Sequence, residues 1–194
     1  MQLDADYWNN RYLNNDSPWD IGYASPAITE YFDKVANKNA SILIHGAGNA
    51  FEAEYLFRKG FNYVFVLDFS EKAIKNFITR VPDFPTENLI QADFFSHFGN
   101  YDYIIEQTFF CAIDPCLRNK YVKKVSELLN DDGRLVGLLF NDAELKGNPP
   151  FGGTIEEYNL LFENEFELDI NLCNNSISPR SGRELFVNLL KKTY

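Results

Sequence analysis

Two short apolar runs, each ending in residues that suit a ligand, constrain this chain more than any other feature. The first is Ser41-Ile-Leu-Ile-His-Gly-Ala-Gly48, and the second, Tyr63-Val-Phe-Val-Leu-Asp68, ends in an acid twenty residues after Gly48. Such runs are typical of buried parallel strands, and glycines at a strand end let a ligand approach the backbone where a helix begins. A carboxylate at the tip of the next strand accepts both ribose hydroxyls. Together the two runs predict a nucleoside-binding site.

The residue three positions after Gly48 distinguishes between nucleoside cofactors. A dinucleotide site uses Gly-x-Gly-x-x-Gly, because the third glycine lets the helix and the strand pack closely around the pyrophosphate. Here that position is Phe51. The ring argues against NAD or FAD but allows a ligand without phosphate, such as S-adenosylmethionine. An ordinary tight turn remains the alternative for Gly-x-Gly alone.

Composition and charge exclude several other classes of function. With 194 residues, of which 45% are hydrophobic and 16% aromatic, the chain is expected to form a single domain over residues 1–194 with a packed core. Its net charge of −10 repels phosphate backbones, so we expect no nucleic-acid partner. Three cysteines without Cys-x-x-Cys spacing favour a reducing compartment, and two histidines without His-x-x-x-His spacing argue against a metal site.

Neither a signal peptide nor a membrane span is expected. The first residues, Met1 to Asp6, contain acids and no apolar run, and no stretch approaches the ~18 apolar residues of a membrane helix. We therefore expect a cytoplasmic protein, a monomer or weak homodimer, that acts on a small molecule and does not bind membranes.

Strands are expected to alternate with helices, which predicts an α/β fold with a mostly parallel sheet between two helical layers. Residues 1–40 are expected to form a mostly helical extension, or lid, and Ser70 is a candidate helix cap. The expected strands are 41–45, 62–68, 87–91, 101–106 and 132–140, the last after a turn at 130–133, and the expected helices are 50–59, 70–78, 116–129 and 156–162. Two further strands, 165–173 and 184–191, are expected to add an antiparallel hairpin at the edge, giving seven strands.

Four segments, in order along the chain, resemble the thiopurine methyltransferase-like family, and especially its thiol and halide methyltransferase branch. They are Ser17-Pro-Trp-Asp-Ile-Gly-Tyr-Ala-Ser-Pro26, Glu106-Gln-Thr-Phe-Phe-Cys-Ala-Ile-Asp-Pro115, Gly147-Asn-Pro-Pro-Phe151 and Arg180-Ser-Gly-Arg-Glu184. The resemblance implies the class I methyltransferase fold, which is Rossmann-like, with S-adenosylmethionine as cofactor and S-adenosylhomocysteine as product. Two positions depart from the branch, since His45 stands where proline is more frequent and Tyr23 where arginine is common.

By this resemblance, the ends of the first two strands hold the cofactor. Gly46 and Gly48 would line its methionine part, Asp68 would hold the ribose, and Phe69 would border the adenine. A purely structural role is less expected for Asp68 than for the other candidates. Burying an acid at the end of so apolar a run costs free energy unless a partner satisfies the carboxyl group.

Two further parts of the implied cofactor site lie elsewhere in the chain. Asp93 would accept a hydrogen bond from the adenine amino group, with Phe94 beside it. The alternative role for Asp93 is that of a helix N-cap. Trp19, in the extension, would fold over the cofactor, where an indole face attracts a sulfonium by roughly 0.5 to 2 kcal/mol. Its alternative role is to anchor the extension, and Trp8 is expected to pack.

The segment after the fourth strand would adjoin the transferred methyl group. Gln107 and Thr108 would hydrogen-bond the cofactor, and Phe109 and Phe110 would wall the substrate pocket. Aromatic residues after a strand are equally typical of a core, so that alternative stays open for both rings.

The remaining substrate contacts are expected from loops. Tyr23, Phe151 and Arg180 are the candidates by resemblance. Asn148-Pro-Pro-Phe151 looks like the box of amino-group methyltransferases, but that box follows the fourth strand and this one follows the fifth, so it is assigned to a pocket rim. Further candidate cations for an anionic substrate are Arg11, Lys146 and Arg183. For each cation, a solvated surface charge is the alternative.

The function implied is methyl transfer to a small soft nucleophile, a thiol or thiopurine, hydrosulfide, thiocyanate or a halide, by in-line displacement. No catalytic base is assigned, because orientation and exclusion of water suffice for such nucleophiles. A binding or regulatory protein without chemistry, a small-molecule N-methyltransferase and a nicotinamide oxidoreductase are the alternatives.

Overall fold

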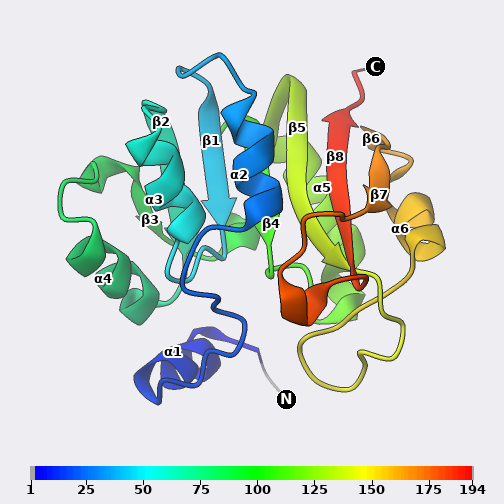
Figure 1. The fold of residues 1–194 in the computed structure, drawn as a ribbon, viewed down its shortest axis with the longest axis horizontal. Helices are drawn as coiled ribbons and strands as arrows, with labels where there is room; N and C mark the ends of the chain where they lie inside the picture. The colour runs from blue at the N-terminus through cyan, green and yellow to red at the C-terminus, as the bar shows by residue number, and fades with distance from the viewer. Residues whose placement is uncertain (1–2, 194) are drawn as a thin grey trace.

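The sheet predicted from the apolar runs forms the centre of the protein (Figure 1). The structure, a computed structural model, describes residues 3–193. The strands lie in the order β3-β2-β1-β4-β5-β8-β6, and β7 also pairs with β8. The strands are β1 Ser41–His45, β2 Tyr63–Asp68, β3 Leu89–Gln91, β4 Tyr101–Gln107, β5 Leu129–Phe140, β6 Phe166–Glu167, β7 Ile170–Leu172 and β8 Glu184–Lys191. The first five strands pair in parallel, and β8 runs antiparallel to β5, β6 and β7.

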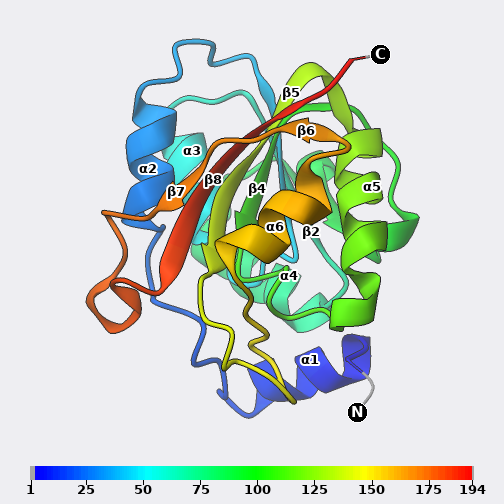
Figure 2. The same ribbon diagram turned by 90° about the vertical axis from the view of Figure 1, so that its right-hand side faces the viewer.

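Helices cover both faces of the sheet, as a parallel sheet requires. They are α1 Ala5–Leu13, α2 Pro26–Asp33, α3 Phe51–Arg58, α4 Glu71–Arg80, α5 Arg118–Leu128 and α6 Ile155–Phe162. Figure 2 shows α2 and α3 on one side of the sheet and α5 on the other. The two larger core clusters lie on these faces: one includes Phe32 of α2 and Phe77 of α4, and another includes Tyr121 of α5 and Phe162 of α6. This is the three-layer α/β arrangement expected from the sequence, and Ser70 caps α4 as predicted.

The C-terminal part of the sheet contains one strand more than expected. The segment expected as a single strand, 165–173, forms two short strands, β6 and β7, on either side of Leu168 and Asp169. Both pair with β8. Within residues 3–193 the sheet therefore has eight strands where seven were expected, while its antiparallel edge is as predicted.

The expected turn at 130–133 is instead part of β5. Asp132 has a φ of +61°, and the pairing of β4 with β5 shifts register between Tyr101 and Tyr103. The turn residues thus form an irregularity inside a strand that begins directly after α5.

The N-terminal extension is less helical than expected, because a non-helical segment, residues 14–25, separates α1 from α2. Helix α1 lies beyond the carboxyl ends of the parallel strands (Figure 1). It is attached there through Asn9, whose Oδ1 accepts the Ser70 hydroxyl at 2.6 Å. Among the helices of residues 3–193, none has both the length and the apolar character to cross a membrane.

Candidate functional site

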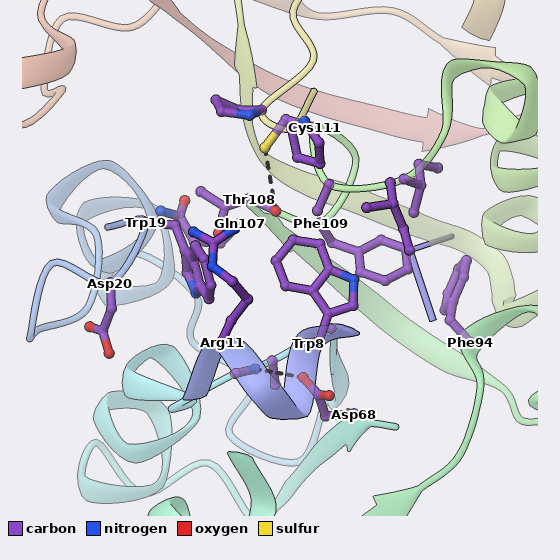
Figure 3. Close-up of a pocket in the computed structure, with 18 of the residues that line it drawn as sticks. Trp8, Arg11, Trp19, Asp20, Asp68, Phe94, Gln107, Thr108, Phe109 and Cys111 are labelled. Carbon is purple, nitrogen blue, oxygen red and sulfur yellow. Dashed lines mark hydrogen bonds between the residues drawn. The ribbon is translucent and has the colours of Figure 1, made fainter. Parts of the chain in front are cut away.

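A cavity of about 760 Å³ lies at the carboxyl ends of β1, β2 and β4, beneath α1 and the segment that follows it. Ligands of open α/β sheets bind at this edge, because the loops there leave a crevice beside the strand ends. Figure 3 shows side chains from α1, the extension and the strand ends converging on this space. The cavity has the volume of a typical small-molecule or cofactor site.

The glycine loop after β1 forms one wall. Gly46 and Gly48 line the cavity and have φ values of +53° and +55°, a region that L side chains rarely adopt. A Cβ at Gly46 would lie 2.0 Å from Cδ2 of Phe109, and one at Gly48 would lie 2.5 Å from the Tyr12 hydroxyl oxygen. The two glycines therefore let aromatic rings close on the loop.

Asp68, at the end of β2, is held in place by backbone groups. The Gly48 N–H donates to its Oδ2 and the Ser70 N–H to its Oδ1, each at 2.8 Å. Burial raises the pKa of this carboxyl, although the N–H donors favour its charged form. Asp68 and Phe69 both line the cavity, so the structure brings this pair and the glycine loop together.

Asp93 and Phe94 line the same cavity. Asp93 caps a short 3₁₀ helix, Phe94–Ser96, by accepting the Phe95 N–H at 3.1 Å. The capping role considered from the sequence is therefore present, at a position that also faces the cavity. Phe94 is buried, and its ring stacks on His45 with centroids 4.5 Å apart.

The end of β4 supplies a third wall, made by Gln107, Thr108 and Phe109. Gln107 Oε1 is buried without a hydrogen-bond partner, so it is an acceptor free for a ligand donor. Thr108 has a φ of +60°, which is unusual for a β-branched residue. The ring of Phe109 lies against Gly46.

The extension closes the cavity with aromatic side chains. The Trp19 ring lies edge-on to Trp8 and to Tyr12, with centroids 5.2 and 5.7 Å apart. The Arg11 guanidinium lies 4.8 Å from the centroid of Trp19. Trp8 thus lines the cavity as well as packing, and Tyr12 is a lining residue that the sequence analysis missed. Only the docking of α1 brings Tyr12 to the glycine loop, and no local pattern signals that docking.

The extension is also tied to the body of the protein. The Ser25 N–H donates to Glu52 Oε1 at 2.9 Å, in a buried contact. Arg180 donates from Nη2 to the Trp19 carbonyl at 2.9 Å. Arg180 and Tyr23 both line the cavity, and Tyr23 stays more than half exposed at its rim.

Two predicted pocket residues lie elsewhere. Phe110 is only 1% exposed and packs in the core against Tyr121 and Phe162, so its assignment to the substrate pocket is corrected. Its neighbour Phe109, which also packs on Tyr121, does line the cavity. Phe151 is absent from the described lining of the main cavity and lines a separate hollow of about 270 Å³ together with Lys146. Pro149 and Pro150 of the same loop do reach the main cavity.

The arginines that line the cavity are all paired with carboxylates. Arg11 contacts Asp16 at 2.6 Å, Arg183 contacts Asp142 at 2.6 Å, and Arg180 contacts Glu184 at 3.4 Å. Carboxylates that also line the cavity are Asp4, Asp20, Glu52, Asp68, Asp93 and Asp114. The described lining therefore favours a positively charged ligand and contains no unpaired cation for a multiply charged anion.

Comparison with known proteins identifies the family. The family model described as Thiopurine S-methyltransferase matches residues 3–184. The chain is 27% identical over 185 residues to probable thiol methyltransferase 2 of Arabidopsis thaliana, covering 91% of this chain and 81% of that protein. It is also 27% identical over 184 residues to thiocyanate methyltransferase 1 of Brassica oleracea, with the same coverage.

The fold agrees with this assignment. A solved structure of 1,6-didemethyltoxoflavin-N1-methyltransferase from Burkholderia thailandensis superposes with a TM-score of 0.79, at 15% identity, covering 98% of this chain and 88% of that one. That structure contains S-adenosylhomocysteine. The chain therefore belongs to the thiopurine S-methyltransferase family of S-adenosylmethionine-dependent methyltransferases.

Proposed function

We propose that this protein methylates a small soft nucleophile, such as a thiol, hydrosulfide, thiocyanate or a halide, with S-adenosylmethionine as the donor. The observation that carries the proposal is an aromatic cavity in which every described lining arginine is already ion-paired. Such a site suits a cationic donor and a small acceptor with at most one negative charge.

The residues present fit the donor. Asp68 is fixed by two N–H donors at the strand ends and is the group to hold ribose hydroxyls, with Phe69 and Phe94 bordering the adenine and Asp93 accepting from its amino group. Gln107 Oε1, buried and unpartnered, is an acceptor for the donor's ammonium group. When bound, S-adenosylmethionine supplies an electrophilic methyl group on a positively charged sulfur.

This chain's own contribution is orientation and exclusion of water. Trp8, Trp19 and Phe109 surround the space between the glycine loop and the end of β4, and removing water from an anionic nucleophile raises its reactivity. Correct orientation of two reactants supplies roughly 7 to 11 kcal/mol of a barrier.

No general base is required. Histidine does not occur among the described lining residues, and burial raises the pKa of the Cys111 thiol and of the Tyr12 hydroxyl, which keeps both neutral. Acceptors that ionise near neutral pH, or that carry a permanent charge, need no proton removed by the protein.

The acceptor class is tested by methyl transfer from labelled S-adenosylmethionine to a panel of compounds. We expect hydrosulfide, thiocyanate, iodide and small aromatic thiols to be methylated, and kcat/KM for glutathione and coenzyme A to be at least about tenfold lower because of their additional anionic groups. Preferential methylation of amines would contradict the proposal. Binding of S-adenosylhomocysteine without transfer to any acceptor would favour a protein that binds the cofactor without chemistry.

A further inference from the structure

Beneath the cavity lies a group of buried polar side chains that the proposed chemistry does not use. His45 of β1, Glu106 of β4 and Tyr121 of α5 are each at most 1% exposed. The Tyr121 hydroxyl donates to Glu106 Oε2 at 2.6 Å. His45 Nε2 lies 3.2 Å from the Tyr121 hydroxyl oxygen and 3.2 Å from Glu106 Oε2. These three residues are called the buried network below.

The buried network is bonded directly to the turn that carries Phe109. Glu106 Oε1 accepts the backbone N–H groups of Phe109 and Phe110, at 2.8 and 2.9 Å. Thr108, directly before them, has the left-handed φ of +60° that its branched side chain disfavours. The carboxylate of Glu106 thus stabilises a turn that the local sequence would not adopt unaided.

His45 links the buried network to the cavity rings. Its ring stacks on Phe94 and lies edge-on to Phe109, with centroids 4.5 and 4.7 Å apart. Its Nδ1 is buried without a partner. An N–H on Nε2 of His45 faces Glu106 Oε2 at 3.2 Å, which accepts it.

We propose that the buried network is a positioning device for the acceptor, which fixes the ring of Phe109 against Gly46 and so sets the wall that faces the nucleophile. The inference rests on the proposed function for its kinetic consequence. The buried network contacts Phe94, at the proposed adenine position, through the rings of His45 and Tyr121, but its described hydrogen bonds do not include Asp68, which is held by Gly48 and Ser70. Loosening the network should therefore weaken acceptor use much more than cofactor binding.

The test compares two buried tyrosines. Tyr121→Phe keeps the ring and removes only the hydroxyl. Tyr101→Phe is the matched control, because Tyr101 is 4% exposed, its hydroxyl contacts His97 Nε2 at 2.8 Å, and it does not line the cavity. With the best acceptor of the panel, we expect Tyr121→Phe to lower kcat/KM about tenfold relative to the control, since small misplacements of reactants have large effects on rate. The affinity for S-adenosylhomocysteine should stay within about twofold of the wild type.

A second measurement, the alkylation of Cys111, does not require a methyl acceptor. Cys111 Sγ donates to the Thr108 carbonyl at 3.4 Å and is buried in the same turn, whereas Cys116 is exposed. Alkylation by iodoacetamide, followed for each peptide by mass spectrometry, then reports the order of the turn, with Cys116 as internal reference. We expect Tyr121→Phe to raise the rate at Cys111 about fivefold or more over Tyr101→Phe. Glu106→Gln, which keeps the side-chain shape but replaces one accepting oxygen by an amide nitrogen, should act in the same direction.

The two readouts separate failure of this inference from failure of the proposed function. If no acceptor is methylated by the wild type, the proposed function fails, and the alkylation experiment still tests the buried network. Equal Cys111 rates in Tyr121→Phe and Tyr101→Phe would overturn the network as a positioning device. A loss of cofactor affinity parallel to the loss of kcat/KM would also overturn it, because the effect would then not be specific to the acceptor.

Discussion

Gly48 donates its backbone N–H to Asp68 Oδ2 at 2.8 Å, which joins the ends of β1 and β2. The second carboxylate oxygen is held by the Ser70 N–H at the same distance. The orientation of the carboxylate is therefore fixed by the fold before a ligand binds, which lowers the cost of ordering the site.

Replacing Gly48 by alanine should open the cavity. The added Cβ would lie 2.5 Å from the Tyr12 hydroxyl oxygen, and the φ of +55° costs a non-glycine residue about 1–2 kcal/mol. We expect Gly48→Ala to lower both the free energy of unfolding and the affinity for S-adenosylhomocysteine, measured by urea unfolding and titration calorimetry.

A control and a rescue separate these two effects. Gly60→Ala has the same kind of strain, since Gly60 has a φ of +80° but no atom within 4 Å of an added Cβ. It should lower stability without changing affinity. Tyr12→Phe removes the oxygen that the new Cβ would meet, so the double variant Gly48→Ala/Tyr12→Phe should regain part of the affinity. If it regains none, the clash with Tyr12 is not the cause.

Replacing Gln107 by leucine should raise stability and lower affinity together. Its Oε1 is buried without a partner, and an unsatisfied buried acceptor costs about 1–3 kcal/mol. We expect Gln107→Leu to unfold at higher urea concentration and to bind S-adenosylhomocysteine about tenfold more weakly, because a ligand acceptor is lost. A variant that binds as tightly as the wild type would exclude Gln107 from the cofactor site.

Much of this arrangement follows from local sequence, because a strand end fixes where its neighbours lie. Once the runs ending in Gly48 and Asp68 are taken as adjacent parallel strands, their ends must meet, and the structure joins them by a hydrogen bond. The same reasoning places Asp93 and Gln107 at that edge, after β3 and at the end of β4.

Side-chain direction and tertiary docking are not fixed in this way. Phe109 and Phe110 have the same local signal and both pack on Tyr121, yet Phe109 lines the cavity whereas Phe110 is 1% exposed and lies in the core. Tyr12 reaches Gly48 through the docking of α1, to which the hydrogen bond between Asn9 and Ser70 contributes. The extra strand arises because the strand pairing is interrupted at Leu168 and Asp169, although polar and apolar residues alternate without a break from Glu165 to Leu172, so the pattern alone predicts one continuous strand.

The stability of the extension should depend on pH through Glu52. Burial raises the pKa of this carboxyl above its ordinary value of 4.5, so the folded protein binds the proton more tightly than the unfolded chain. The stabilisation that this proton binding gives the folded protein is therefore fully present below the pKa of Glu52 in the unfolded chain. It is lost as the pH rises through the pKa of Glu52 in the folded protein. Glu52→Gln keeps an oxygen for the Ser25 N–H but does not titrate.

The expected result is that the free energy of unfolding of Glu52→Gln improves relative to the wild type as the pH rises, by about 1.4 kcal/mol for each unit of pKa shift. Urea unfolding of both proteins at about pH 4, 5.5 and 7 measures the difference between their free energies of unfolding. The other titrating groups are common to both proteins, so their effects cancel in this difference. A difference that stays constant across this range would contradict the assignment.

The most direct test of the account is calorimetric titration of S-adenosylhomocysteine into the wild type and into Asp68→Ala, with Asp83→Ala, an exposed acid paired with Arg58, as the control. We expect micromolar binding by the wild type and the control, and a loss of about 2 kcal/mol, or roughly thirtyfold, in Asp68→Ala, because hydrogen bonds to the ribose are removed. Wild-type protein that does not bind, or Asp68→Ala protein that binds as tightly as the control, would contradict it.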